Sequence, residues 1–186
     1  MVINQTLSEA EQKMSKAVDV TREDFAAIRT GRAHPAMFAK LTAEYYGAPT
    51  PLQQLATFQV PEARVVLITP FDQSSVNAVE KSIRDSDLGV NPSNDGISIR
   101  VSMPQLTEQR RKEYIKLAKT KAEDARISVR GARRTAKDAL DKLVKDKEVG
   151  EDEVTRAEKQ LDAETKKHTD AVDDLFKHKE ADLLAV

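Results

Sequence analysis

The sequence predicts an α+β protein: a long, coiled-coil-like three-helix bundle that carries a small inserted domain. All seven prolines and four of the six glycines lie within residues 31–104. That stretch holds 13 charged residues in 74, whereas the other 112 residues hold 48, and a charged chain rich in Ala and Leu is typical of long solvated helices. Because the composition changes twice, we expect residues 1–30 and 105–186 to form the bundle and residues 31–104 to form the insert.

Each of the three expected bundle helices repeats apolar residues at spacings of three and four, which mark one face of a helix. In the first helix these are Ile3, Leu7, Ala10, Met14, Val18, Thr21, Phe25 and Ile28. In the second, expected from the N-cap Thr107 to Lys145, a strict seven-residue repeat comprises Ala118, Ala122, Ala125, Val129, Ala132, Ala136, Ala139 and Leu143. The segment VGED at 149–152 breaks that helix, and the third carries Val154, Ala157, Leu161, His168, Ala171, Leu175 and Leu183 on its inner side.

The insert has a different pattern. Residues 97–103 alternate apolar and polar side chains from Ile97 onward, and residues 63–70 form a second apolar run, so both segments predict strands. Residues 42–51 predict a strand that runs into a Gly/Pro turn. Residues 72–87 begin with the N-cap candidate Asp72 and carry Val76, Val79 and Ile83 on one face, which predicts a short helix.

A basic stripe on the second helix is the strongest functional signal. It consists of Arg126, Arg130, Arg133, Arg134 and Lys137, and residues 125–137 include no acidic residue, although the whole chain has 30 basic and 31 acidic side chains. On a helix the five fall within an arc of about 100°. Like charges at i,i+4 destabilise a helix by about 0.2–0.5 kcal/mol per pair, and arginine suits bidentate phosphate contacts. The pattern therefore favours a polyanion interface over a merely solvated face.

The type of polyanion follows from what surrounds the stripe. A membrane surface would need large apolar side chains beside the basic ones, and only Ile127 qualifies. Reading DNA bases usually requires a short helix in the major groove, whereas a long, rigid helix suits folded RNA, which is recognised by shape and phosphates. We therefore predict an RNA partner, no membrane and no DNA. Gly131 either lets a partner's backbone approach or is simply tolerated.

Other functional classes find little support in the composition. The chain has no cysteine, which excludes disulfides and thiolate metal sites. It has no apolar run near the roughly 18 residues that a membrane span needs, so we expect a cytoplasmic protein. The three histidines lack the spacing of metal ligands, and no Gly-rich phosphate loop is present. We expect a monomer that is not an enzyme, with no catalytic residue, no metal and no cofactor.

Five stretches resemble the ribosome recycling factor family, in the family's order. They are IRTGRAHP at 28–35, EYYGAPTPLQQLA at 44–56, SDLGVNPSNDG at 86–96, LTEQRRKEY at 106–114 and ARISVRGARR at 125–134. The resemblance covers essentially the whole chain. It implies an L-shaped molecule with a small β/α/β domain. It also implies a translation factor that, with elongation factor G and GTP, splits the post-termination ribosome into subunits for reuse.

The resemblance also implies roles for individual residues. Arg130 and Arg133 would be the chief contacts to large-subunit ribosomal RNA near the intersubunit bridge. The supporting contacts would be Arg126, Arg134 and Lys137, with Arg29, Arg110 and Arg111 at further basic positions. A two-strand hinge would consist of Thr30, Gly31 and Arg32 on one strand and Met103, Pro104 and Gln105 on the other. The alternative hypothesis is a helical co-chaperone or scaffold whose stripe meets an acidic protein partner.

Overall fold

The structure is a computed structural model, and it describes residues 2–185. The chain packs as two compact units. One, the bundle unit, comprises the chain up to Phe25 together with Ile115–Ala181, and the other, the small unit, comprises Ala26–Tyr114 with the chain from Asp182 onward. The domain limits expected from composition, at residues 31 and 104, stay a prediction.

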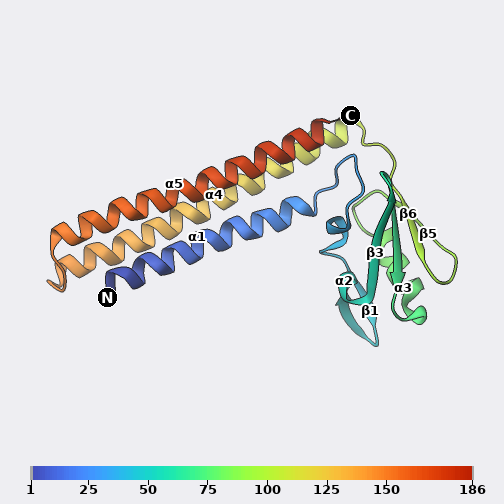
Figure 1. Ribbon diagram of the computed structural model, residues 1–186, viewed down its shortest axis with the longest axis horizontal. Helices are drawn as coiled ribbons and strands as arrows, with labels where there is room; N and C mark the ends of the chain where they lie inside the picture. The colour runs from blue at the N-terminus through green and yellow to red at the C-terminus, as the bar shows by residue number, and fades with distance from the viewer. Residues whose placement is uncertain (1, 186) are drawn as a thin grey trace. The chain divides into compact units, whose positions relative to one another are not determined.

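The bundle unit is built from three helices, as the apolar repeats predict. They are α1 (Val2–Ala26), α4 (Glu108–Lys145) and α5 (Glu151–Leu184), and Figure 1 shows them running side by side. The start of α4 is the predicted one, because the Thr107 hydroxyl accepts a hydrogen bond from the Arg110 amide at 3.1 Å, the contact that an N-cap makes. A short turn at 146–150, with Lys147 at φ 57°, separates α4 from α5.

The seam of α4 follows the predicted repeat as far as Ala136 and then departs from it. Leu140 is fully buried, whereas Ala139, the predicted position, is exposed. The reason is geometric, since an α-helix with 3.6 residues per turn drifts by about 20° per seven-residue repeat. After three repeats the inner face has rotated by about 60°, more than half of the roughly 100° between consecutive residues. A spacing of four residues in place of three brings the next apolar side chain, Leu140, back onto that face. A similar one-residue correction applies to α5, where Val172 is fully buried and Ala171 only half-buried.

The small unit contains a four-stranded antiparallel sheet in the order β3-β4-β6-β5. The strands are β3 (Ala56–Glu62), β4 (Val65–Pro70), β5 (Asn91–Asn94) and β6 (Ile99–Ser102), and a separate hairpin pairs β1 (Thr42–Tyr45) with β2 (Ala48–Pro51). The short helical segments are η1 (Pro35–Phe38), α2 (Leu52–Leu55), η2 (Gln73–Ser75) and α3 (Val76–Arg84). Together with the bundle this confirms the predicted α+β fold class.

Strands β3 and β5 were not predicted, and both lie at the edges of the sheet. Each contains a proline, Pro61 in β3 and Pro92 in β5, which lacks an amide donor and is tolerated on an edge strand. Their mixed polarity hides the alternation that marks β6. Strand β6 itself begins later than predicted, so Ile97 lies in the preceding turn and is exposed rather than inward-facing.

The small unit has one continuous core between the sheet and α3. Its fully buried members include Val66 and Ile68 from β4 and Val101 from β6. The predicted inner face of α3 is confirmed, because Val76, Val79 and Ile83 all belong to this core. Asp72 caps η2, which leads directly into α3, by accepting a 2.9 Å hydrogen bond from the Ser74 amide.

The β1–β2 hairpin turns through two residues with positive φ, Tyr46 at 50° and Gly47 at 78°. Such a turn matches the twist of the strands and favours Asn-Gly. Glycine meets the requirement at no steric cost, but a bulky residue at positive φ is an outlier and costs about 1–2 kcal/mol. The hairpin therefore keeps an aromatic residue at a position where its own backbone disfavours one.

Candidate nucleic-acid interface

The basic stripe lies along α4 beside α5, and carboxylates from outside residues 125–137 reach it. Three of its five side chains pair with α5: Arg126 with Asp173 at 2.7 Å, Arg133 with Asp162 at 2.7 Å, and Lys137 with Glu158 at 3.8 Å. The pairs step in opposite directions along the two helices, as expected for an antiparallel pair joined by the 146–150 turn. The stripe is therefore not a row of unpaired charges.

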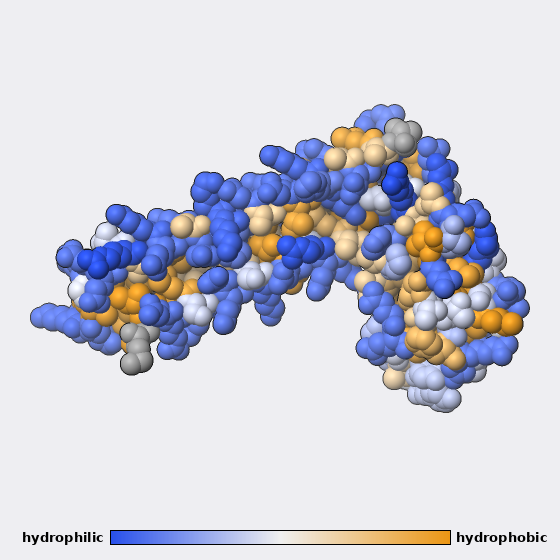
Figure 2. Space-filling model, viewed as in Figure 1, coloured by the Kyte–Doolittle hydropathy of each residue, from blue (hydrophilic) through white to orange (hydrophobic). Residues whose placement is uncertain are grey.

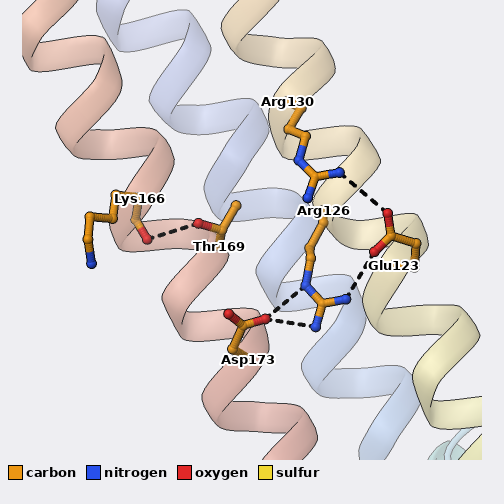
Figure 3. Close-up of polar contacts among 6 residues, drawn as sticks. All are labelled: Glu123, Arg126, Arg130, Lys166, Thr169 and Asp173. Atoms are coloured by element: carbon orange, nitrogen blue, oxygen red, sulfur yellow. Dashed lines mark hydrogen bonds and ion pairs between the residues drawn. The ribbon is translucent and has the colours of Figure 1, made fainter.

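Arg126 is the most heavily engaged member of the stripe. Its Nε donates to Asp173 at 2.8 Å and its Nη1 donates to Glu123 at 3.1 Å, so the guanidinium bridges α4 and α5 (Figure 3). Only 23% of the side chain is exposed. Partial burial by itself lowers the pKa of Arg126, but the bonds to Asp173 and Glu123 together outweigh it and raise that pKa above its ordinary value. Arg126 acts as a link between helices, with few donors left for a phosphate.

Arg130 and Arg134 are much freer. Arg130 reaches the other Glu123 oxygen at 3.4 Å and keeps 57% of its side chain exposed (Figure 3). Arg134 is exposed and makes no ion pair or hydrogen bond with the part of the chain that the structure describes. Gly131 lies between them, and a Cβ added there would meet no atom within 4 Å. This part of α4 is open to a partner.

Arg133 is held by a carboxylate at one edge of its guanidinium, and the other edge is available to a partner. Its Nε donates to Asp162 at 2.7 Å, while its two terminal nitrogens donate no hydrogen bond within residues 2–185. A carboxylate that holds the inner edge of a guanidinium fixes the plane in which the outer edge points. The outer pair of donors is the one that can grip a phosphate in bidentate fashion.

Arg29, predicted as a further RNA contact, lies in a different environment. It is 5% exposed, and its Nη1 donates to the carbonyls of Leu88 and Gly89 at 3.0 and 3.2 Å. Its Nη2 donates to the carbonyl of Pro104, and burial lowers the pKa of the Arg29 guanidinium. Its terminal nitrogens are thus given to three carbonyls within the small unit. RNA contact by Arg29 stays a prediction.

The other predicted basic positions and the hinge residues lie at the ends of α1 and α4. Arg110 is exposed and lies 3.7 Å from Glu113, and Arg111 is half-buried in the first turns of α4. The segments that contain Thr30–Arg32 and Met103–Gln105 have no helix or strand, and Met103 is buried in the small unit's core. RNA contact by Arg110 and Arg111, and bending at the two segments, stay predictions.

Residues 2–185 contain neither a metal-binding cluster nor a membrane-spanning helix. No group of three or more His, Asp or Glu side chains in that range is arranged to hold a metal ion. No helix in the described chain is both long enough and apolar enough to span a membrane.

Reasoning from sequence missed the carboxylates that shape the stripe. Glu123 could have been found, because it lies three residues before Arg126 on the same helix. Asp162 and Asp173 lie far away in sequence, and finding them requires folding α5 back on α4 about the 146–150 turn. The helix break predicted at VGED indicates that α5 folds back on α4. It does not fix which face of each helix meets the other.

Comparison with known proteins gives a consistent result. The family model described as ribosome recycling factor matches residues 21–184. The ribosome-recycling factors of Kineococcus radiotolerans and Streptomyces coelicolor are 66% and 65% identical to this chain over 185 residues, with 100% of each chain covered.

Solved structures agree with the sequence comparison. A solution structure of a ribosome recycling factor aligns with a TM-score of 0.80 at 38% identity, over 100% of this chain and 99% of that one. A T. thermophilus ribosome recycling factor, described with E. coli elongation factor G bound to the E. coli post-termination complex, aligns with a TM-score of 0.70 at 40% identity over 100% of both chains. The match of sequence and fold along the full chain shows that this protein belongs to the ribosome recycling factor family.

Proposed function

We propose that this chain binds the post-termination ribosome and, together with elongation factor G and GTP, splits it into subunits for reuse. The observation that carries the proposal is the exposed face of α4, where Arg130, Arg133 and Arg134 offer free donors, in a chain of this family. The related factor described with elongation factor G in a post-termination complex supports both partners. In this proposal the chain acts as a cytoplasmic monomer.

The residues of the stripe have different roles in this proposal. Arg130, Arg133 and Arg134 contact phosphates of large-subunit ribosomal RNA near the intersubunit bridge, and Lys137 adds a weaker contact at the end of the stripe. Arg126 holds α4 against α5 so that the contact face stays straight. Because RNA of this kind is recognised by shape and phosphates, a rigid helix with fixed donors is an appropriate surface.

GTP hydrolysis by elongation factor G supplies the energy. Elongation factor G pushes on this chain, and the hinge converts that push into a displacement of the small unit. The segments Thr30–Arg32 and Met103–Gln105 form the two strands of the hinge in this proposal. Arg29 binds the carbonyl of Pro104, so the two strands are tied to each other and bend together. The bundle unit holds the RNA while the hinge moves.

The test is co-sedimentation with purified post-termination ribosomes across a salt series. Arg130→Ala/Arg133→Ala is compared with Arg156→Ala/Lys159→Ala, which removes the same charge from exposed positions of α5 outside the stripe. If about four phosphates are neutralised, log affinity falls with log salt at a slope of about −3 to −4, and losing two contacts lowers that magnitude by about 1.5. Equal binding by the two double variants would refute the proposal, and a shallow slope would favour an acidic protein partner.

A further inference from the structure

The turn between β5 and β6 contains a dipeptide that is chemically reactive in flexible chains. Asp95 and Gly96 are the chain's one Asp-Gly pair, and the sequence has no Asn-Gly pair. In an Asp-Gly pair the glycine nitrogen attacks the aspartate side chain readily, because glycine has no Cβ to hinder the approach. Both residues are exposed, and hydrophilic colour covers much of the surface of the small unit (Figure 2), so water reaches the turn.

The reaction rearranges the backbone and needs no reagent other than water. The Gly96 nitrogen forms a bond to Cγ of Asp95, the Cγ–OH bond of the neutral carboxyl breaks, and the hydroxyl leaves with the amide proton as water. The product is a cyclic succinimide. Water then opens the ring at the main-chain carbonyl of Asp95, and the backbone continues through the former side chain as isoaspartate. No atom is gained or lost overall, and the backbone is longer by one methylene group.

The folded turn withholds the nucleophile of this reaction. The Gly96 amide donates its proton to Oδ1 of Asn94 at 3.0 Å, and the nitrogen must give up that proton before it can attack. The Gly96 carbonyl accepts a hydrogen bond from the Gln73 side chain at 3.0 Å, so the residue is held on both sides. Asn94 is itself oriented by α3, because its Nδ2 donates to the Glu80 carboxylate.

The turn also keeps the Asp95 carboxyl in its unreactive form. Its Oδ1 accepts hydrogen bonds from the amides of Ile97 and Ser98 at 2.9 and 2.8 Å. These bonds, with that from Ser98 the strongest influence, lower the pKa of Asp95, so the carboxyl is ionised at neutral pH. An ionised carboxylate has no hydroxyl to release as water, and the folded turn therefore disfavours ring closure at both reacting groups.

The position of the pair makes the rearrangement costly to the fold. Strand β6 is an inner strand, paired with both β4 and β5 (Figure 1). Asn94 lies opposite Ile99 where the hairpin closes, and Ile99 is fully buried in the core of the small unit. An added methylene at residue 95 moves the carboxylate away from its two amide donors and disturbs the register of the hairpin.

We propose that Asp95–Gly96 is a site of isoaspartate formation and that Asn94 suppresses the reaction in the folded turn. Local opening of the β5–β6 turn frees the Gly96 amide and permits ring closure. The product carries a free α-carboxylate, which is the group that isoaspartate-repair methyltransferases methylate. Chains that have aged or unfolded thereby become substrates for an enzyme of that class. The proposal is independent of the proposed function.

The first test compares the folded and the unfolded wild-type chain. Both are aged at physiological temperature and mildly acidic pH, one in buffer and one in guanidinium chloride, and tryptic peptides are analysed by electron-transfer fragmentation. Trypsin releases residues 85–100 as one peptide, in which Asp85–Ser86 and Asp87–Leu88 serve as internal references. We expect isoaspartate at residue 95 in the unfolded chain. It should form at least about tenfold more slowly in the folded chain, because two or more hydrogen bonds must break first. Equal rates overturn the proposal, as does a product confined to Asp85 or Asp87.

The second test removes the group that holds the Gly96 amide. Asn94→Ala is aged in the folded state beside Ser93→Ala, which truncates an exposed neighbour in β5. Isoaspartate at residue 95 should form about two- to tenfold faster in Asn94→Ala than in the wild type, the factor for one lost hydrogen bond. Ser93→Ala should match the wild type, and melting curves establish that both variants are folded during ageing. A wild-type rate in folded Asn94→Ala overturns the protective role of Asn94. If Asn94→Ala does not fold, the first test still decides the proposal, since it needs no variant.

Discussion

Arg29 of the small unit and two arginines of the bundle unit, Arg130 and Arg134, are used in opposite ways. In the small unit, Arg29 is buried and gives its donors to backbone carbonyls, which no partner can replace. In the bundle unit, Arg130 and Arg134 lie on an exposed face of α4, and the carboxylate that Arg130 meets is itself exposed. A phosphate can take the place of such a carboxylate at little cost, because exposed ion pairs contribute only about 0–1 kcal/mol. An arginine whose donors are bonded within the chain thus stabilises the fold, whereas an arginine with unbonded donors is available to bind a partner.

The largest expected effect comes from removing the buried arginine. Arg29→Met keeps the apolar length of the side chain and deletes its donors, so the three carbonyls lose charge-assisted bonds worth about 1.5–3 kcal/mol each before solvent compensates. We expect the small unit to lose about 2–4 kcal/mol of unfolding free energy, the usual cost of breaking a buried polar network. Urea denaturation followed by tyrosine fluorescence measures it, because Tyr45, Tyr46 and Tyr114 all belong to that unit.

Arg134→Met is the matched control for Arg29→Met. It removes the same group from an exposed position without a partner in the described chain, so unfolding should shift by less than about 0.5 kcal/mol. Equal stability of the two variants would contradict the contrast between a structural and an available arginine.

A smaller effect is expected within the stripe itself, at Arg126. Arg126→Met removes the bridge from Glu123 to Asp173 between α4 and α5. We expect a loss of about 1 kcal/mol from the bundle unit, because the pair is only partly screened by solvent. Helix content followed by circular dichroism during urea denaturation measures it. Arg130→Met, which breaks only a 3.4 Å exposed contact, should cost less than half as much, and the reverse order would show that Arg126 is not the link.

What the sequence could predict is what repeats along the chain. The helices, the inner face of α3 and the five members of the stripe follow from spacing within one element, and the structure places all of them on the expected helices. The seam of α4 was right through Ala136 and wrong at Ala139, because the straight helix drifts from a seven-residue repeat. Periodic signals locate faces well and lose accuracy with length.

What the sequence could not predict depends on neighbours from elsewhere in the chain. Arg29 donates hydrogen bonds to the carbonyls of Leu88, Gly89 and Pro104, and no property of residue 29 itself indicates these partners. Strands β3 and β5 are edges whose prolines and polar residues resemble loops. The carboxylates opposite the stripe require the register of α5 against α4. In each case the deciding partner is distant in sequence.

The next prediction concerns competition for Arg133. Asp162→Asn removes the charge that holds Nε of Arg133 and leaves the shape of the side chain almost unchanged. If Asp162 mainly competes with phosphate, ribosome affinity should rise about 1.5- to 5-fold, which corresponds to the 0.2–1 kcal/mol of an exposed pair. Equilibrium co-sedimentation at fixed salt measures the change. Asp152→Asn, at the start of α5 and without an ion pair in the described chain, controls for net charge; a weaker complex specific to Asp162→Asn would mean that this carboxylate positions Arg133 for its partner.

The smallest effect lies in the small unit and appears only at high pH. The hydrogen bond from the Tyr45 hydroxyl to Asp72 raises the pKa of Tyr45 to about 12, above its ordinary value near 10. Between pH 10 and 12 the unfolded phenol has lost its proton while the folded one keeps it, so the stabilising contribution is complete below pH 10 and is lost as pH rises to about 12. At neutral pH this contribution is constant, because the Tyr45 hydroxyl exchanges no proton there.

A spectrophotometric titration of the native protein checks this value directly. The difference between the wild-type and Tyr45→Phe absorbance curves isolates one phenolate, and we expect its midpoint near pH 12. Asp72→Asn removes the negative charge and should lower that midpoint, since a neutral acceptor disfavours the phenolate less. A midpoint near 10 in the folded wild-type chain would mean that the hydroxyl is not bound to Asp72. The hairpin turn with Tyr46 would then lack its tie to the end of β4, and the commitment of polar side chains to the fold in the small unit would rest on Arg29.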